Sequence, residues 1–207
     1  MNKTRILKLP PSGPIDQNII AETVDALRQG RLVIIPTDTV YGVAADPHNE
    51  KAVAMLPRIK KRPNDKPIPI LASDCLQIEN LNARFGINGR ELAGRYWPGP
   101  LTIVLPVANE WEGFRIPKHP ITLAIIRAAG GLLRVTSANL SGHSPALTAD
   151  KALGELPEGV SLAVDSGPAP GGVPSTVVKI ENEKVSVLRE GAIPGEEILA
   201  MCANRIK

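Results

Sequence analysis

The sequence contains few aromatic residues and only two cysteines. Aromatic residues make up 3% of the 207-residue chain, so its core must consist of Val, Ile, Leu and Ala side chains. Cys75 and Cys202 lie far apart and outside any metal-ligand spacing, which favours a reducing, cytoplasmic setting. No apolar run approaches the roughly 20 residues of a membrane-spanning helix. The first residues also lack the apolar segment and cleavage site of a signal peptide. We therefore expect a cytoplasmic protein that does not enter a membrane.

Several familiar catalytic and nucleotide-binding motifs are missing. The P-loop pattern G-x-x-x-x-G-K-S/T and the dinucleotide fingerprint G-x-G-x-x-G do not occur. Composition permits a Ser-His-Asp triad, but the G-x-S-x-G elbow is absent. Three scattered histidines give no zinc-ligand spacing. If the chain binds a nucleotide, it must use Lys, Arg, Ser and Asn side chains. A net charge of +3 allows an anionic ligand or weak RNA contact, but it is too small for a dedicated nucleic-acid binder.

The apolar pattern predicts one domain of mixed secondary structure. Strands alternate with helices in the first two thirds, and the last third shifts toward strands, with a hairpin turn at 181–183. This order predicts an α/β fold with a twisted, mixed sheet flanked by helices. Pro57 is expected to shorten or kink its helix. The predicted strands span 32–35, 68–72, 101–107, 132–135, 160–164, 175–180 and 184–188, and the predicted helices run from Asp16 to Gly30 and over about 50–59, 87–96, 120–129 and 195–201.

Two loops rich in hydroxyl groups follow predicted buried strands. Pro36–Gly42 follows the apolar run Leu32–Ile35, and Thr136–Gly142 follows the strand at 132–135. A loop that leaves the end of a buried strand in an α/β sheet is where ligands usually bind. The two loops can therefore converge on one ligand, with Gly42 allowing its close approach. The alternative is that each loop only caps itself through Asx and Ser/Thr turns.

Two further segments carry cations. The segment Lys60–Pro67 has four cationic side chains within seven residues, and its prolines stiffen the backbone. This arrangement suits the binding of a polyphosphate. The alternative, which is the more common one for such clusters, is a run of charges exposed to solvent. Arg115 could bind a carboxylate with two parallel hydrogen bonds. His119 precedes Pro120 and is either a functional imidazole or a helix cap. Trp97–Thr102, with two prolines around a glycine, is expected to shape a pocket wall.

These segments together resemble the YrdC-like family, the L-threonylcarbamoyladenylate synthases of tRNA modification. The resemblance is strongest over residues 16–193, and we expect residues 1–207 to form one YrdC-like domain of the short form, without an additional C-terminal domain. The matching segments are Pro36–Gly42, Lys60–Pro63, Pro98–Thr102, Arg115–His119, Ser137–Gly142, Ser175–Val178 and Leu188–Ile193, in the family's order.

The resemblance implies an enzyme that condenses L-threonine, bicarbonate or CO2, and ATP to threonylcarbamoyl-AMP and pyrophosphate. It implies a concave basic ligand-binding surface, ATP as a substrate and Mg2+ carried with the nucleotide. It also implies downstream threonylcarbamoyl-transfer proteins and possible contact with tRNA or double-stranded RNA. The alternatives are a non-catalytic RNA-binding relative and a module that handles carbamoyl-adenylate with a different acceptor.

The resemblance also implies the site residues. L-Threonine would be held by Thr39, Arg115, Val135 and Ser175. ATP would be held by Lys60, Arg62, Lys66, Ser137, Asn139 and Arg189, with Lys60 and Arg62 stabilising charge; no metal ligand from the protein is expected. Within the first loop we expect Thr39 to contact the ligand, and Thr37, Asp38 and Tyr41 to shape the loop. The chain departs from the family pattern at Lys66, Leu71 and Pro145, where Asn, His and Ser are usual.

Overall fold

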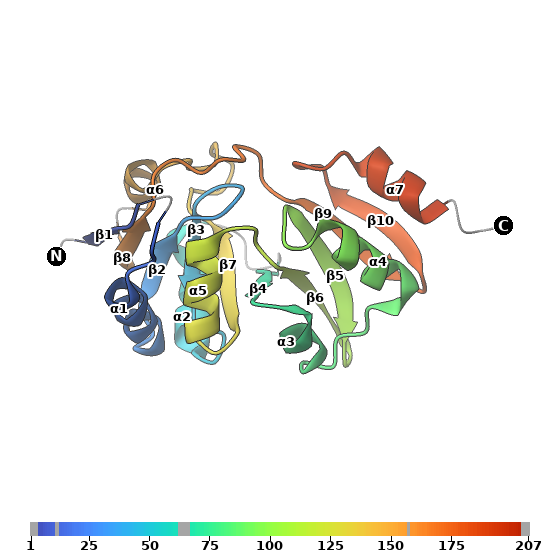
Figure 1. The fold of residues 1–207 in the computed structure, drawn as a ribbon, viewed down its shortest axis with the longest axis horizontal. Coiled ribbons are helices and arrows are strands. Elements are labelled where there is room, and N and C mark those ends of the chain that lie inside the picture. The colour runs from blue at the N-terminus through green and yellow to red at the C-terminus, as the bar shows by residue number, and fades with distance from the viewer. Residues whose placement is uncertain (1–3, 11–12, 62–66, 157, 204–207) are drawn as a thin grey trace.

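A single ten-stranded sheet runs through the computed structural model (Figure 1), which describes residues 4–10, 13–61, 67–156 and 158–203. Its strands lie in the order β1-β8-β2-β3-β7-β4-β6-β5-β9-β10, with both parallel and antiparallel neighbours. The strands are β1 Arg5–Lys8, β2 Leu32–Ile35, β3 Gly42–Ala45, β4 Ile70–Ala72, β5 Leu101–Val107, β6 Glu110–Arg115, β7 Leu132–Ser137, β8 Val160–Asp165, β9 Thr176–Glu181 and β10 Lys184–Arg189. The helices in these ranges are α1 Gln17–Arg28, α2 Glu50–Ile59, α3 Cys75–Glu79, α4 Gly86–Tyr96, α5 Pro120–Ala128, α6 Ala149–Glu155 and α7 Gly195–Ala203.

Helices cover both faces of the sheet around β2. Val33 and Ile35 pack with the apolar side chains of α1 and α5 on one face. Leu32 and Ile34 pack with those of α2 and α6 on the other face. All four residues are inaccessible to solvent. Burial on both faces explains why this strand is continuously apolar rather than alternating.

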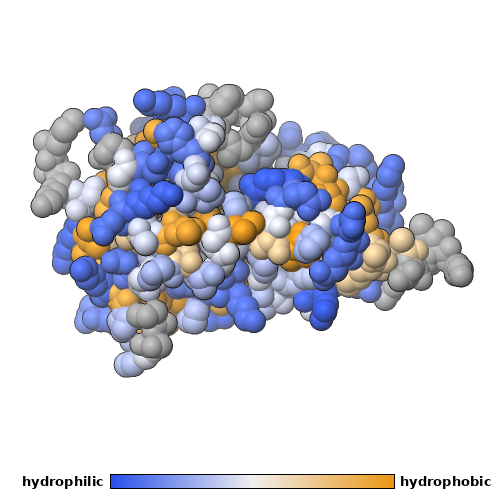
Figure 2. All heavy atoms as spheres, turned by 90° about the horizontal axis from the view of Figure 1, so that it is seen from above, coloured by the Kyte–Doolittle hydropathy of each residue, from blue (hydrophilic) through white to orange (hydrophobic). Residues whose placement is uncertain are grey.

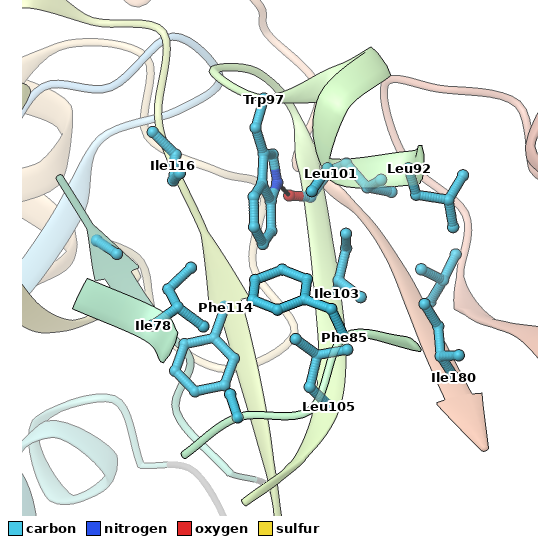
Figure 3. Close-up of a cluster of buried hydrophobic side chains, with 14 of the residues drawn as sticks. Ile78, Phe85, Leu92, Trp97, Leu101, Ile103, Leu105, Phe114, Ile116 and Ile180 are labelled. Carbon is cyan, nitrogen blue, oxygen red and sulfur yellow. Dashed lines mark hydrogen bonds between the residues drawn. The ribbon is translucent and has the colours of Figure 1, made fainter. Parts of the chain in front are cut away.

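The other end of the sheet has its own apolar core, formed by β5, β6, β9 and the helices α3, α4 and α7. Trp97 follows α4 and packs edge-to-face on Phe85, with ring centroids 6.1 Å apart and an interplanar angle of 81° (Figure 3). The Trp97 Nε1–H donates to the carbonyl oxygen of Leu101 at 2.7 Å. This bond satisfies the polar edge of a buried indole and fixes the turn that leads into β5. This agrees with the expectation that Trp97–Thr102 has a structural role.

The α/β prediction is confirmed, and the predicted local signals are present at most element ends. Asp16 caps α1 by accepting from the backbone N–H of Asn18 at 2.9 Å. Asn182 and Glu183 form the turn between β9 and β10, both with positive φ. Pro57 lies inside α2, which continues to Ile59 as predicted, so the proline does not shorten it.

Five elements were not predicted: β1, β3, α3, β6 and α6. Their sequences carry weak local signals, as in the Gly-Val-Ala-Ala of β3 and the charged Glu-Trp-Glu-Gly-Phe-Arg of β6. Each of these two strands is paired on both sides: β3 with the preceding β2 and the distant β7, and β6 with the preceding β5 and the distant β4. Pairing with neighbouring strands, rather than local propensity, therefore makes them strands.

The face of the molecule seen in Figure 2 is mostly hydrophilic. Seen from above in Figure 2, the described apolar residues form separate small patches rather than one continuous area. Across the described part of the chain, no helix has both the length and the apolar character needed to cross a membrane.

Candidate functional site

The loop between β2 and β3 is held in shape by Thr37 and Tyr41. The Thr37 Oγ1 accepts from the backbone N–H groups of Thr39 and Val40, at 3.1 and 3.2 Å, and bonds the carbonyl oxygen of Val40 at 2.7 Å. The Tyr41 hydroxyl donates to the carbonyl oxygen of Gly167 at 2.6 Å. Both residues therefore shape the loop as predicted, and the Thr39 Oγ1 lies 3.0 Å from the Thr37 Oγ1, within hydrogen-bond distance.

Arg115, at the end of β6, reaches this loop. Its Nη1 donates to Thr39 Oγ1 at 2.9 Å, its Nη2 to Asp38 Oδ1 at 2.5 Å, and its Nε to the carbonyl oxygen of Gly99 at 3.0 Å. The guanidinium carries five N–H groups, so one on each terminal nitrogen remains. Those two make no hydrogen bond with a described residue. Asp38, which was expected to shape the loop, also pairs through its carboxylate with Arg115, a contact that the sequence did not indicate.

Lys60, at the end of α2, is directed into the loop that follows β7. Its side chain is buried, and its Nζ donates to the carbonyl oxygens of Ser137 and Asn139. The Asn139 side-chain Nδ2 donates to the carbonyl oxygens of Leu140 and His143, at 2.9 and 2.8 Å. Among the described residues the Asn139 Oδ1 is buried without a hydrogen-bond partner. A buried acceptor of this kind can take a hydrogen bond from a ligand donor.

Ser175 and Arg189 meet at the start of β9. The Arg189 Nη2 donates to the carbonyl oxygen of Ser175 at 2.6 Å and lies 3.1 Å from its Oγ. The Ser175 Oγ also lies 2.8 Å from Thr102 Oγ1, within hydrogen-bond distance. Both hydroxyls are buried, whereas Arg189 is exposed. The predicted contact residues Ser175 and Arg189 are therefore direct neighbours.

Backbone hydrogen bonds join these groups into one site. The N–H of Ala138 donates to the carbonyl oxygen of Tyr41 at 2.8 Å, which ties the loop after β7 to the loop after β2. The N–H of Gly172 donates to the carbonyl oxygen of Thr39 at 2.9 Å, which ties in the segment before Ser175. The predicted convergence of the two polar loops is therefore present.

Some predicted site residues lie elsewhere or cannot be placed. Arg62 and Lys66 fall outside the described residues. Val135 is buried in the apolar cluster beneath α1 and α5. Its side chain lies against Gly42, so the close approach allowed by that glycine is between β3 and β7. The expectation that Gly42 makes room for a ligand is therefore not supported.

Burial dominates the electrostatics around Arg115. It lowers the pKa of the Arg115 guanidinium, and the neighbouring Asp38 carboxylate opposes this shift. Burial likewise lowers the pKa of His119, again opposed by Asp38. His119 caps α5, because its Nδ1 accepts from the backbone N–H of Thr122 at 3.4 Å. A lowered pKa keeps this imidazole neutral at pH 7, as an accepting nitrogen requires.

Two cavities border the site without containing its centre. One, of about 360 Å³, is lined by Arg58, Pro67, Ile68 and Arg134 among others, and it adjoins the predicted basic segment at Pro67. The other, of about 390 Å³, lies on the Trp97 side of the 97–100 turn. Neither cavity is lined by Arg115 or by its partners Asp38 and Thr39, which together are called the Arg115 group. The chemistry of the buried groups therefore identifies the candidate site better than cavity size does.

The comparisons with known proteins agree with this arrangement. Residues 25–191 match the model of the Sua5/YciO/YrdC family, which is described as "Telomere recombination".

The chain belongs to the Sua5/YciO/YrdC family.

Relatives within the Sua5/YciO/YrdC family carry one recurring name. A putative threonylcarbamoyl-AMP synthase of Mycobacterium tuberculosis is 35% identical over 189 residues, which are 86% of this chain and 87% of that protein. A putative threonylcarbamoyl-AMP synthase of Methanocaldococcus jannaschii is 35% identical over 97% of this chain and 99% of its own length. Among solved structures, Pyrococcus abyssi Sua5 complexed with L-threonine superposes with a TM-score of 0.88 at 31% identity; it covers 95% of this chain, which spans 60% of that longer chain.

Three contacts in this member of the Sua5/YciO/YrdC family were not found from the sequence. They are the ion pair of Asp38 with Arg115, the hydroxyl pair of Thr102 with Ser175, and the close approach of Gly171 to the loop at Asp38. Thr102 lies in a segment that the sequence analysis singled out, and Gly171 lies a few residues before another. Nothing in those segments indicates which partner each residue contacts.

Proposed function

We propose that this chain is a threonylcarbamoyl-AMP synthase, which condenses L-threonine, CO2 or bicarbonate, and ATP to threonylcarbamoyl-AMP and pyrophosphate. The observation that carries the proposal is the buried guanidinium of Arg115, which bonds Thr39 and keeps one N–H on each terminal nitrogen for a carboxylate. The name shared by relatives that match nearly the whole chain supports it. The likeness to a Sua5 structure complexed with L-threonine points the same way.

In this function the Arg115 group holds the amino acid. The two remaining N–H groups of Arg115 bind the α-carboxylate, and the Thr39 hydroxyl lies beside them. Ser175 completes the proposed threonine site, and Val135 is included from the family resemblance alone. A planar guanidinium that is already fixed by three hydrogen bonds loses little freedom when it binds, which favours a tight and oriented complex.

ATP occupies the neighbouring segments in this proposal. Ser137 and Asn139 lie in the loop that Lys60 organises, and Arg189 lies beside Ser175 on the other side. The threonine carbamate attacks the α-phosphorus, an oxygen–phosphorus bond forms, and the bond to the pyrophosphate oxygen breaks. The protein therefore supplies positioning and positive charge rather than a nucleophile. We include Arg62 and Lys66 in this role from the sequence alone.

Magnesium is proposed to enter with the nucleotide. Within the described ranges no three His, Cys, Asp or Glu side chains lie together as a metal site. This donor set suits an ion held by phosphate oxygens and water, which is how Mg2+ usually accompanies ATP. When bound, the ion would neutralise charge on the triphosphate.

We extend the proposal to the whole chain: residues 1–207 act as one domain, because one sheet carries all the site segments. The concave basic surface, the cytoplasmic location, tRNA contact and downstream transfer proteins stay predictions from the sequence.

The test is pyrophosphate release by the purified chain supplied with ATP, L-threonine and bicarbonate, with threonylcarbamoyl-AMP identified by mass. Arg115→Lys keeps the charge but loses the planar fork, so we expect at least a tenfold higher KM for L-threonine, since hydrogen bonds to charged groups contribute about 1.5–3 kcal/mol. Arg127→Gln, on the exposed last turn of α5, is the control and should behave as wild type. Absence of the product from the wild-type chain would overturn the proposal.

A further inference from the structure

Asp38 forms a buried ion pair with Arg115, and the sequence analysis did not assign Asp38 to any binding site. Its Oδ1 lies 2.5 Å from Arg115 Nη2, and the two side chains are only 10% and 7% exposed. Its second oxygen, Oδ2, makes no hydrogen bond with any described residue, and it is not sealed from solvent as the orphan oxygen of Asn139 is. One oxygen of this carboxylate is therefore engaged and the other is open.

The pair changes what Arg115 can bind. Asp38 and Arg115 together carry no net charge, and the neighbouring His119 is neutral at pH 7 and adds none. A ligand with only a carboxylate would leave two carboxylates sharing one guanidinium in a buried place, which is costly. A zwitterion brings one charge of each sign, so the site stays neutral after binding.

The available hydrogen-bonding groups match a zwitterion. Arg115 offers one N–H on each terminal nitrogen to a carboxylate, and Asp38 offers Oδ2 to a cationic donor. Both groups belong to one rigid assembly, because Thr39 and Gly99 hold the guanidinium from two other sides. In an α-amino acid the carboxylate and the ammonium lie on adjacent atoms, as the two halves of this pair do.

We propose that Asp38 is a specificity-determining residue, whose open Oδ2 accepts a hydrogen bond from the α-ammonium of the amino-acid substrate while Arg115 binds its carboxylate. The inference rests on the proposed function and deepens it. The site would select free α-amino acids against α-hydroxy acids and against amines without a carboxylate. Once CO2 is added, the carbamate nitrogen retains one N–H, so the same oxygen keeps a donor.

The wild-type chain tests this selection without any substitution. Calorimetry would compare L-threonine with two analogues that each lose one charge: 2,3-dihydroxybutanoate, where a hydroxyl replaces the ammonium, and L-threoninol, where an alcohol replaces the carboxylate. We expect each analogue to bind at least tenfold more weakly than L-threonine. Binding of the hydroxy acid as tight as that of L-threonine would overturn the role of Asp38.

The variant Asp38→Asn separates recognition from support of Arg115. Removal of the negative charge should weaken L-threonine at least tenfold, and it should leave the hydroxy acid bound as tightly as before or more tightly, because Arg115 is no longer neutralised. A residue that only supports Arg115 would weaken both ligands alike, and this result would contradict the proposal. Asp38→Glu keeps the charge and should retain the preference for L-threonine. Asp150→Asn, at an exposed position in the first turn of α6, is the matched control.

Failure of this inference is distinguishable from failure of the proposed function. If the wild-type chain releases pyrophosphate with L-threonine but binds the hydroxy acid equally well, the synthase assignment stands and the role of Asp38 falls. If the wild-type chain neither binds L-threonine nor releases pyrophosphate, both fall. If Asp38→Asn does not fold, the wild-type ligand series still decides the matter.

Discussion

Gly171 controls the position of Thr39, and its replacement by alanine gives the sharpest steric test of the site. A Cβ at position 171 would lie 2.5 Å from the carbonyl oxygen of Asp38 and 2.9 Å from the Cα of Thr39. Ordinary contact begins at 3.4 Å, so the two segments must move apart by about 0.9 Å. Both obstacles are backbone atoms, which cannot rotate away as a flexible side chain would. The substitution must therefore displace the loop that Arg115 contacts.

The expected cost follows from this displacement. Overpacking of a tight contact typically lowers the free energy of unfolding by about 1–3 kcal/mol. Misplacement of a substrate-binding group by about 1 Å costs on the order of 10²-fold in activity. We therefore expect kcat/KM for L-threonine to fall by roughly that factor for Gly171→Ala. Pyrophosphate release against L-threonine concentration and urea denaturation measure the two effects.

Gly172→Ala is the matched control. Gly172 has φ +70°, and no atom lies within 4 Å of a Cβ placed there. Alanine at this position pays a backbone cost of about 1–2 kcal/mol without pushing on Thr39. We expect it to lose stability but to keep most of its kcat/KM. Equal kcat/KM for Gly171→Ala and the wild type would refute the steric argument.

Three further predictions concern support of the site and of the fold. Lys60→Met leaves the carbonyl oxygens of Ser137 and Asn139 without their buried donor, so ATP affinity should fall at least tenfold with little change in L-threonine affinity; calorimetry with each ligand checks this. Because burial lowers the pKa of His119 below its usual 6.5, the unfolded chain binds a proton that the folded chain does not, and the free energy of unfolding should fall as pH drops through 6.5. His119→Asn, which retains a capping side chain, should flatten that decline in urea titrations at pH 7.5 and 5.5. The Glu183 carboxylate accepts from two backbone N–H groups at the start of α4, so Glu183→Ala should cost about 1 kcal/mol of stability and leave pyrophosphate release unchanged.

The fold was predictable from the sequence where the hydrophobic pattern of a single segment is enough to indicate its secondary structure. The apolar run of β2 and the alternating pattern of β5 gave the observed bounds, Leu32–Ile35 and Leu101–Val107. Arg5–Lys8 has a single buried residue, and it becomes a strand only because β8 pairs with it. Gly113 weakens the signal of β6, which becomes a strand because β5 and β4 pair with it. Pairing partners decide such strands, and the local sequence pattern of the strand itself does not reveal them.

The candidate site shows the same division. Thr39 and Arg115 were named from motifs, and the structure brings them within 2.9 Å. Asp38 was expected to shape its loop, and the sequence did not indicate its pairing with Arg115, which lies far along the chain. Motifs therefore indicated which side chains matter, and only the packed sheet determines which of them pair.

The interleaved strand order has a consequence for how the chain folds. Arg5 pairs with Leu162, Val33 also pairs with Leu162, and Leu101 pairs with Thr176. Contacts between such distant positions slow folding, because loop closure must be completed before they contribute stability. During synthesis β1 and β2 must wait for β8 to emerge between them. The Arg115 group assembles late as well, because the loop that carries Thr39 is held by a hydrogen bond from the backbone N–H of Gly172. The ability to bind substrate is therefore gained only after almost the whole chain has been made.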